Sequence, residues 1–198
     1  MSGDGSADPA SAKSARARYW QSFAAAFAAA IFSFVTLPWT LAVFSTLLAG
    51  LAIWIALVDL EDLIIPDLAT AGIAILGMAL IVVETPAGAL TEEILDALMR
   101  AIAAGGLLFL VRLAFHRFAG KEGLGLGDVK LMAAGATLLS WASLPYALIL
   151  AAAAAIMLIV LRGLRHGAWL DRETEIPFGA FLAPAIWAAF ALERLYLL

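Results

Sequence analysis

The sequence contains no cysteine, and only 14% of its 198 residues are charged. Without cysteine the chain can form neither disulfide bonds nor thiolate zinc sites. The two histidines, His116 and His166, have no cluster of further metal ligands beside them in the sequence, so we expect no metal site. Few charges together with 64% hydrophobic residues exclude the composition of a soluble globular domain. The composition is typical of a polytopic membrane protein.

Long apolar runs dominate the chain, and a helix needs about 20 apolar residues to cross the hydrocarbon core. The sequence therefore predicts an all-α, polytopic integral membrane bundle of about six or seven transmembrane helices in one domain. The expected spans are 20–37, 39–58, 67–84, 95–115, 129–143, 144–162 and 177–197. The fifth span is short and is interrupted by Gly135, so a partly buried helix packed against the others is the alternative.

The distribution of charge predicts how the chain sits in the membrane. Residues 1–18 are rich in Ser, Ala, Gly and Asp, which is typical of a disordered tail, and we expect the transmembrane domain to occupy residues 19–198. Lysine and arginine gather in the tail and in the loops after the fourth and sixth spans, whereas residues 84–94 carry glutamates and no basic residue. Because basic loops stay in the cytoplasm, the N-terminus is expected there.

Two aspartates lie at the edges of predicted spans, where carboxylates are costly and usually mark function. Asp59 ends the second span and Asp128 precedes the fifth, so the predicted topology puts both at the cytoplasmic face at similar depth. Two neighbouring carboxyl groups cannot both ionise easily and tend to share a proton. The ionised member can then deprotonate a water while the protonated member polarises a carbonyl group. Such a pair predicts hydrolysis that requires no cofactor.

The residues around each aspartate suit that chemistry. Gly125 and Gly127 remove side chains beside Asp128, so that the backbone can approach an extended substrate. Pro66 suits the first turn of the third span, and Asp67 is expected to stabilise the start of that helix.

Three further charged residues lie near the pair in the sequence. Lys130 is expected to lower the effective pKa of the pair or to meet a lipid phosphate, and a snorkelling interfacial lysine is the alternative. Glu61 and Asp62 are candidates for attracting a basic substrate, and the alternative is a solvated loop. The glycine-rich loop 118–126 is a candidate mobile gate.

Three stretches together resemble a known family. Asp59 stands seven residues before Pro66-Asp67, Asp128 closes Gly-x-Gly-Asp and is followed by x-Lys, and Pro177-Phe-Gly179 precedes the last predicted span. These frames resemble the type IV prepilin peptidases, which are membrane aspartic proteases with a Gly-x-Gly-Asp motif. The resemblance covers roughly residues 40–198.

The resemblance implies that Asp59 and Asp128 are the catalytic pair of an aspartic endopeptidase in a type IV pilus or protein secretion system. The implied reaction removes the short basic leader of prepilins or pseudopilins after a glycine, at the cytoplasmic face of the bacterial inner membrane. The implied partners are these substrates and membrane lipid, with no nucleic acid, and the oligomeric state is left open. Many members carry an additional cysteine-containing domain linked to N-methylation. The chain lacks cysteine, so the resemblance implies a peptidase-only form.

Two other readings remain open. A related membrane protease of the preflagellin or presenilin-like branch would use the same pair, but a presenilin-like protein should show Tyr-Asp at the first aspartate and Pro-Ala-Leu near the end. The sequence reads Val58-Asp59 and Ala183-Pro184-Ala185 instead. A proton-coupled transporter or assembly factor would use its aspartates as proton carriers. Transporters often contain inverted repeats and broken helices at mid-membrane depth, and neither pattern is evident.

Overall fold

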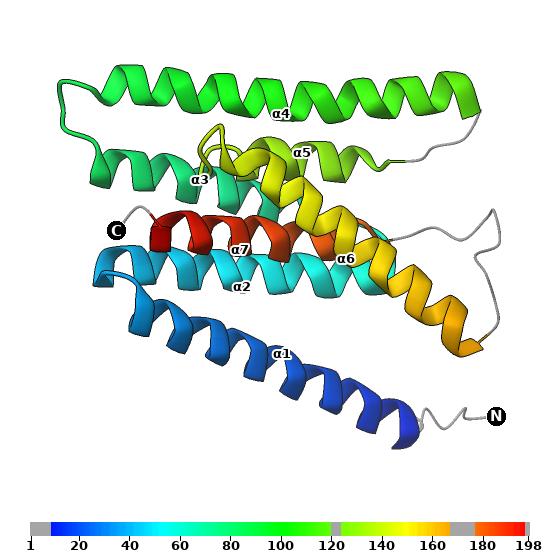
Figure 1. Ribbon diagram of the computed structural model, residues 1–198. Coiled ribbons are helices and arrows are strands. Elements are labelled where there is room, and N and C mark those ends of the chain that lie inside the picture. Colours follow the sequence, from blue (N-terminus) through cyan, green and yellow to red (C-terminus); the bar gives the residue numbers. More distant parts are fainter. Residues whose placement is uncertain (1–8, 120–123, 167–176, 197–198) are drawn as a thin grey trace, which may run out of the picture.

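The computed structural model describes residues 9–119, 124–166 and 177–196, and within these ranges all regular structure is helical. The predicted all-α class is confirmed. The helices, shown in Figure 1, are α1 Pro9–Thr36, α2 Trp39–Asp62, α3 Asp67–Glu84, α4 Leu90–Ala119, α5 Leu126–Gly135, α6 Ser143–His166 and α7 Gly179–Tyr196.

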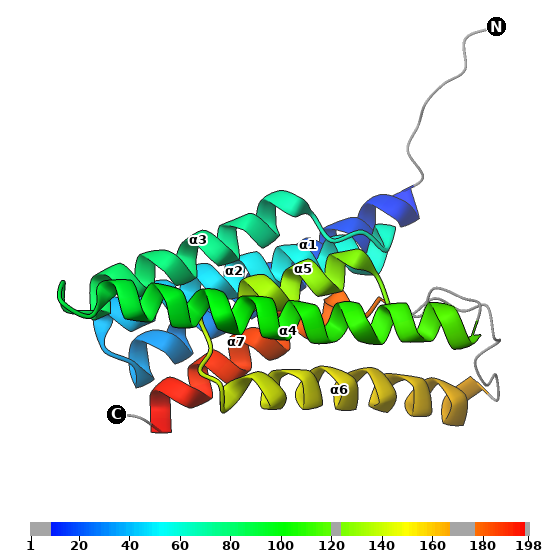
Figure 2. The same cartoon turned by 90° about the horizontal axis from the view of Figure 1, so that it is seen from above.

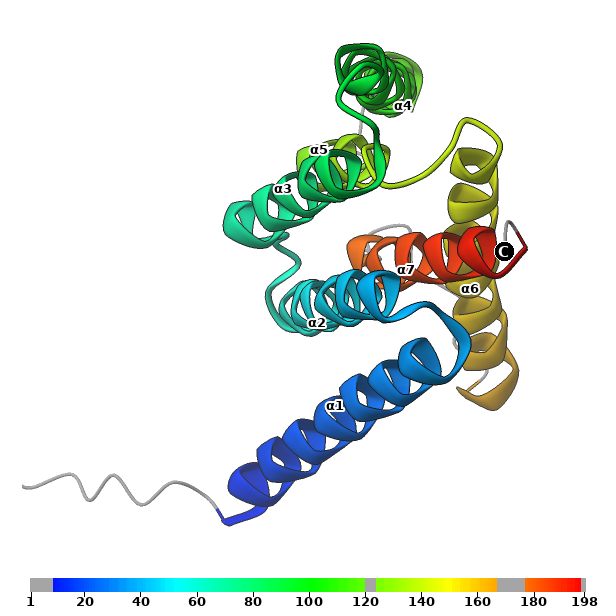
Figure 3. The ribbon, with the colours of Figure 1, turned by 90° about the vertical axis from the view of Figure 1, so that its left-hand side faces the viewer.

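The helices pack around α2 and α7, which lie side by side at the centre of the bundle (Figures 1 and 3). α1 covers one side of α2, and α6 packs against α7. α5 contacts α3, α4 and α7, so it is enclosed on several sides despite its short length. α4 lies on the outside of the bundle against α5: it is the uppermost helix in Figure 1 and the one nearest the viewer in Figure 2.

Four of the described helices, α2, α3, α4 and α6, are long and apolar enough to cross a membrane. α1 contains a shorter apolar stretch at Trp20–Thr36. Large apolar side chains also cover the outside of these helices, for example Phe23, Ile75 and Leu110. Lipid would solvate such a surface better than water does, so the predicted multi-pass membrane bundle is confirmed.

The fifth predicted span, 129–143, is wrong. α5 begins three residues earlier and ends at Gly135, so its ten residues extend about 15 Å, half of the hydrocarbon thickness. At its last residue the helix packs closely against α7, since a Cβ atom at Gly135 would lie 2.7 Å from Ile186 Cδ1. The alternative of a buried helix packed against the others is the one that the structure adopts.

The first helix also differs from expectation. α1 begins at Pro9, inside the segment 1–18 that was expected to be a disordered tail. Residues 9–18 are therefore helical, which corrects the boundary, while residues 1–8 lie outside the described residues. A cytoplasmic location of the tail stays a prediction.

Glycines allow several helices to approach α5 closely, as expected for membrane helices. A Cβ atom at Gly77 in α3 would overlap Thr137 Oγ1, and one at Gly105 in α4 would lie 2.9 Å from Ala133 Cβ. Gly106, the next residue of α4, has open space beside it. The two close contacts draw α3 and α4 onto α5 and its C-terminal turn.

The helix ends that carry the candidate site residues lie together at one end of the bundle. The N-terminal end of α1, the C-terminal end of α2 and the N-terminal ends of α5 and α7 lie at the same end (Figure 1). Asp59 and Asp128 therefore share one end of the molecule, as the predicted topology required. Which side of a membrane this end faces stays a prediction.

Candidate active site

Asp59 is buried in the last turn of α2, with 5% of its surface exposed. Its Oδ2 atom accepts a hydrogen bond of 2.8 Å from the backbone N–H of Ala180, the second residue of α7. Free backbone N–H groups and the helix dipole make a helix N-terminus a favourable place for a carboxylate. The C-terminal end of α2 and the N-terminal end of α7 are thus joined through Asp59.

Asp128 is buried in the first turn of α5, with 6% of its surface exposed. Its Oδ2 atom accepts a 3.1 Å hydrogen bond from the backbone N–H of Gly125, the N-cap residue. Its Oδ1 atom is buried and has no hydrogen-bond partner among the described residues. A buried acceptor without a partner costs about 1–3 kcal/mol, so such an atom calls for a functional explanation.

The two carboxyl groups are close enough to interact electrostatically. The pKa of Asp128 is raised from 3.8 to about 6, mainly by burial and secondly by the negative charge of Asp59. The hydrogen bond from Gly125 opposes this shift because it favours the ionised form. Near neutral pH the pair can therefore pass a proton between itself and a bound water, which acid–base catalysis requires.

Ile65 lies between the N-terminal ends of α5 and α7. These two ends supply the backbone N–H groups that donate to Asp128 and Asp59. A Cβ atom at Gly127 would lie 3.0 Å from Ile65 Cβ, and a Cβ atom at Gly179 would lie 2.5 Å from Ile65 Cδ1 and 3.0 Å from Asp59 Oδ2. Glycine at both positions thus makes room for one isoleucine side chain. The side chain packs the α2–α3 connection against both α5 and α7.

Sequence reasoning missed this role of Ile65, although part of the signal was present. Pro66 restricts the residue before it to extended backbone, and Pro66 is itself the N-cap residue of α3. Leu63 closes α2 in the left-handed conformation, with φ 56° and ψ 31°, and its N–H donates to the carbonyl of Asp59. The left-handed Leu63 and the restricted Ile65 together turn the chain from the end of α2 to the start of α3.

Lys130 has a partner other than the aspartate pair. Its Nζ lies 2.8 Å from Asp67 Oδ1, and both side chains are largely exposed. This contact joins α5 to the first residue of α3. The expected effect of Lys130 on the aspartate pair stays a prediction.

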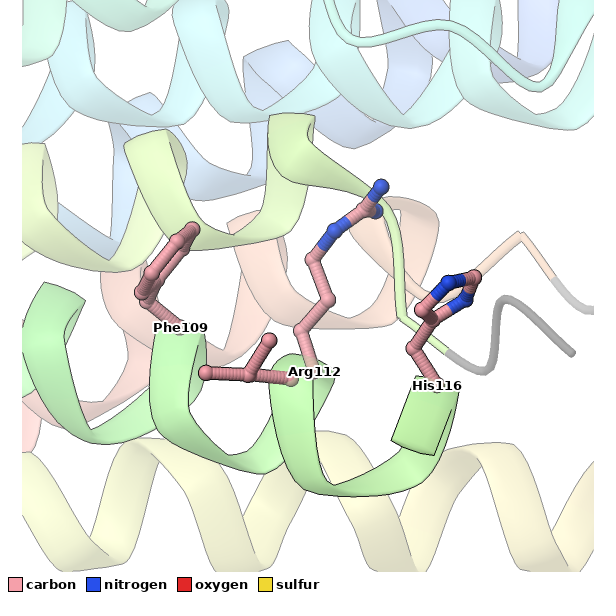
Figure 4. Close-up of a pocket in the computed structure, with 4 residues that line it drawn as sticks. Phe109, Arg112 and His116 are labelled. Atoms are coloured by element: carbon pink, nitrogen blue, oxygen red, sulfur yellow. The ribbon is translucent and has the colours of Figure 1, made fainter. Parts of the chain in front are cut away.

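The other candidate residues belong to the end of α2, the approach to α7 and the loop before α5. Glu61 and Asp62 lie exposed in the last turn of α2, and Pro177 is half-buried just before α7. Residues 120–123 of the candidate gate lie outside the described residues. A hollow on α4 is lined by Phe109, Arg112, Leu113 and His116, and neither aspartate lines it (Figure 4).

Comparison with known proteins identifies a family and several relatives of this chain. The model of the type IV leader peptidase family matches residues 46–160, which include both aspartates. The prepilin leader peptidase/N-methyltransferase of Aeromonas salmonicida (strain A449) is 34% identical over 166 residues, which cover 77% of this chain and 53% of the relative. The leader peptidase HopD of Escherichia coli is 32% identical over 142 residues, which cover 72% of this chain and 88% of the relative.

The chain thus spans about half the length of the Aeromonas relative and most of the length of HopD. No solved structure matches the chain. The family match covers more than half of the sequence and contains the Asp59 and Gly-x-Gly-Asp128 frames, each of which brings a buried carboxylate to the same end of the bundle. The chain belongs to the type IV leader peptidase family.

Proposed function

We propose that this chain is an aspartic endopeptidase of the bacterial inner membrane that removes the short basic leader of type IV prepilins or pseudopilins. The cut falls after a glycine at the cytoplasmic face, next to the hydrophobic helix of the substrate. Relatives named prepilin leader peptidases support this substrate class. The observation that carries the proposal is the pair of buried carboxyl groups, one from α2 and one from α5, at a single end of the bundle.

The reaction uses Asp59 and Asp128 as a unit. The ionised member takes a proton from a water molecule, and the water oxygen attacks the scissile carbonyl carbon. The protonated member donates a hydrogen bond to the carbonyl oxygen, which carries the developing negative charge. The carboxyl group that took the proton from the water then gives it to the leaving nitrogen as the C–N bond breaks, and the pair returns to one ionised and one protonated member. The unpartnered Oδ1 of Asp128 is available for the water or for the substrate carbonyl.

The surroundings of the pair suit a membrane-anchored substrate with a basic leader. Glu61 and Asp62 place negative charge on the exposed end of α2, beside the proposed site. Opposite charge steers a substrate toward a site more than it adds to affinity. The outer surface of the bundle is apolar and would face lipid. The hydrophobic helix of the substrate can therefore stay in the lipid beside the bundle while its leader reaches the site.

Cleavage of a prepilin by the purified protein in lipid tests this proposal. Wild type is compared with Asp59→Asn and Asp128→Asn, and Glu92→Gln, at an exposed acidic residue of α4, serves as the control. Cleavage by wild type and by the control, without cleavage by either active-site variant, supports the paired-aspartate mechanism. Robust cleavage by either active-site variant would remove it, and no cleavage of several prepilins by folded wild type would overturn the proposed function.

A further inference from the structure

Two arginines of α4 contact the two ends of the segment that contains α5. Arg100 Nε donates to the carbonyl of Ala136, the residue that follows α5, at 3.3 Å. Arg112 Nη1 donates to the carbonyl of Leu124, two residues before α5 begins. Figure 4 shows the Arg112 side chain extending from α4 toward the chain that leads into α5.

The spacing of the two contacts matches the antiparallel packing of the helices. Arg100 and Arg112 are 12 residues apart on α4, and the carbonyls that they bind are also 12 residues apart. Twelve helical residues extend about 18 Å, slightly longer than α5 itself. Midway, Gly105 approaches Ala133 so closely that a Cβ atom would not fit. Both arginines can therefore bind only when α5 lies at one position along α4.

The arginine at the far end is held firmly. Arg100 is 7% exposed, and its guanidinium also binds Asp96 and Glu93 on the preceding turns of α4. Asp96 accepts a further hydrogen bond of 2.9 Å from Trp141 Nε1, in the segment after α5. The planar guanidinium can make these contacts simultaneously because its five N–H groups point in fixed directions.

We propose that Arg100 and Arg112, the two-arginine clamp, are positioning residues that set the depth of α5 and thereby hold the Asp128 carboxyl group opposite Asp59. α5 is too short to be fixed by both membrane interfaces, so its depth must come from its neighbours. Asp128 lies in its first turn, and any sliding of α5 along α4 moves that carboxyl group directly. This inference rests on the proposed function for its catalytic readout, but not for its structural one.

The catalytic readout is the steady-state cleavage of a prepilin by Arg100→Gln, Arg112→Gln and the double variant. The double variant is expected to lose roughly 100-fold in kcat with little change in KM, because misplacing a catalytic group by about 1 Å costs that much. Arg100→Lys and Arg112→Lys should recover part of the loss, since lysine can still donate to one carbonyl. Arg194→Gln is the control at the far end, because Arg194 pairs with Glu84 of α3.

The structural readout needs no substrate. The chain has no cysteine, so nitroxide labels can be placed on cysteines introduced at Leu126 in α5 and Val82 in α3, both exposed. Pulsed electron paramagnetic resonance then reports the distance between them. We expect the distance distribution to shift or widen in the double variant and in Arg112→Gln, but not in Arg194→Gln.

The two readouts separate the possible failures. An unchanged distance distribution in the folded double variant would overturn the clamp, whether or not the protein cleaves prepilins. A shifted distribution with unchanged kcat would overturn the positioning role. A shifted distribution in a protein whose wild type cleaves no prepilin would support the clamp while refuting the proposed function. Should Arg100→Gln fail to fold, Arg112→Gln and the two lysine variants carry the same comparison.

Discussion

The two ends of α5 differ in how the ionisable groups beside them are paired. At its C-terminal end the buried Arg100 lies between two carboxylates, those of Glu93 and Asp96, so opposite charges compensate one another. At its N-terminal end two acidic groups, Asp59 and Asp128, are buried with hydrogen bonds only from backbone amides among the contacts described. Removing one partner of a buried ion pair leaves an uncompensated charge and is destabilising, whereas two buried like groups disfavour ionisation of both and are typical of acid–base sites. The contrast separates carboxylates that hold the bundle together from carboxylates that can react.

The largest expected effect comes from neutralising the acidic end. Asp128→Asn should reduce prepilin cleavage by roughly 1,000-fold or more, within the range that acid–base groups contribute. Its stability should not fall, because the amide oxygen can still accept from Gly125 N–H and the repulsion from Asp59 disappears. Thermal unfolding and cleavage, measured on the same preparation, check both statements.

At the C-terminal end of α5 we expect the reverse: a loss of stability with little loss of cleavage. Asp96→Asn removes one partner of the buried Arg100 and should lower the free energy of unfolding by about 1 kcal/mol, a value reduced because Asp96 is partly exposed. Its cleavage rate should stay within a fewfold of wild type. If Asp96→Asn lost cleavage as completely as Asp128→Asn without unfolding, the distinction between the two ends would be wrong.

A smaller effect is expected from filling the space beside Ile65. In Gly179→Ala the new methyl group would lie 2.5 Å from Ile65 Cδ1 and 3.0 Å from Asp59 Oδ2, so either the Ile65 side chain or the start of α7 must shift beside the carboxylate. We expect cleavage to fall roughly 10-fold or more, because small displacements at a catalytic group are costly. Adding Ile65→Ala should restore part of the rate, and Gly106→Ala, which has open space around it, should be neutral. Equal losses in the single and double variants would show that Ile65 is not the obstacle.

The placement of both aspartates at one end of the bundle was predictable from sequence, because helix length and charge asymmetry determine topology. The length of α5 was not predictable, because the hydropathy over 129–143 gives no sign that the helix ends at Gly135, where it packs against Ile186 of α7. The same limit hid Ile65, whose contacts with two glycines come from separate parts of the chain. Local patterns predict elements, but contacts between distant residues decide where an element ends and which side chain fills a gap.

A pH-dependent effect on stability should appear at the acidic end alone. The pKa of Asp128 is raised to about 6 in the folded protein, above 3.8, so between these values the folded state binds more protons than the unfolded state. Stability should therefore fall as the pH rises from 4 to 6, and this contribution should level off above that range. The difference in thermal unfolding between wild type and Asp128→Asn across this range isolates the effect from other carboxyl groups. A difference that stays constant between pH 4 and pH 6 would show that burial does not hold the proton on Asp128.

The smallest effect is expected for the exposed ion pair between Lys130 and Asp67, which borders the acidic end without entering it. Exposed pairs contribute about 0–1 kcal/mol, so Lys130→Gln should change stability by less than that, and less again at high salt. A double-mutant cycle with Asp67→Asn measures the coupling of the two side chains. If Lys130 acts only through Asp67, both single variants should leave the pH dependence of cleavage unchanged. A shift of that profile in Lys130→Gln but not in Asp67→Asn would instead assign the lysine to the catalytic carboxyl groups, and the acidic end would then contain a counter-charge of its own.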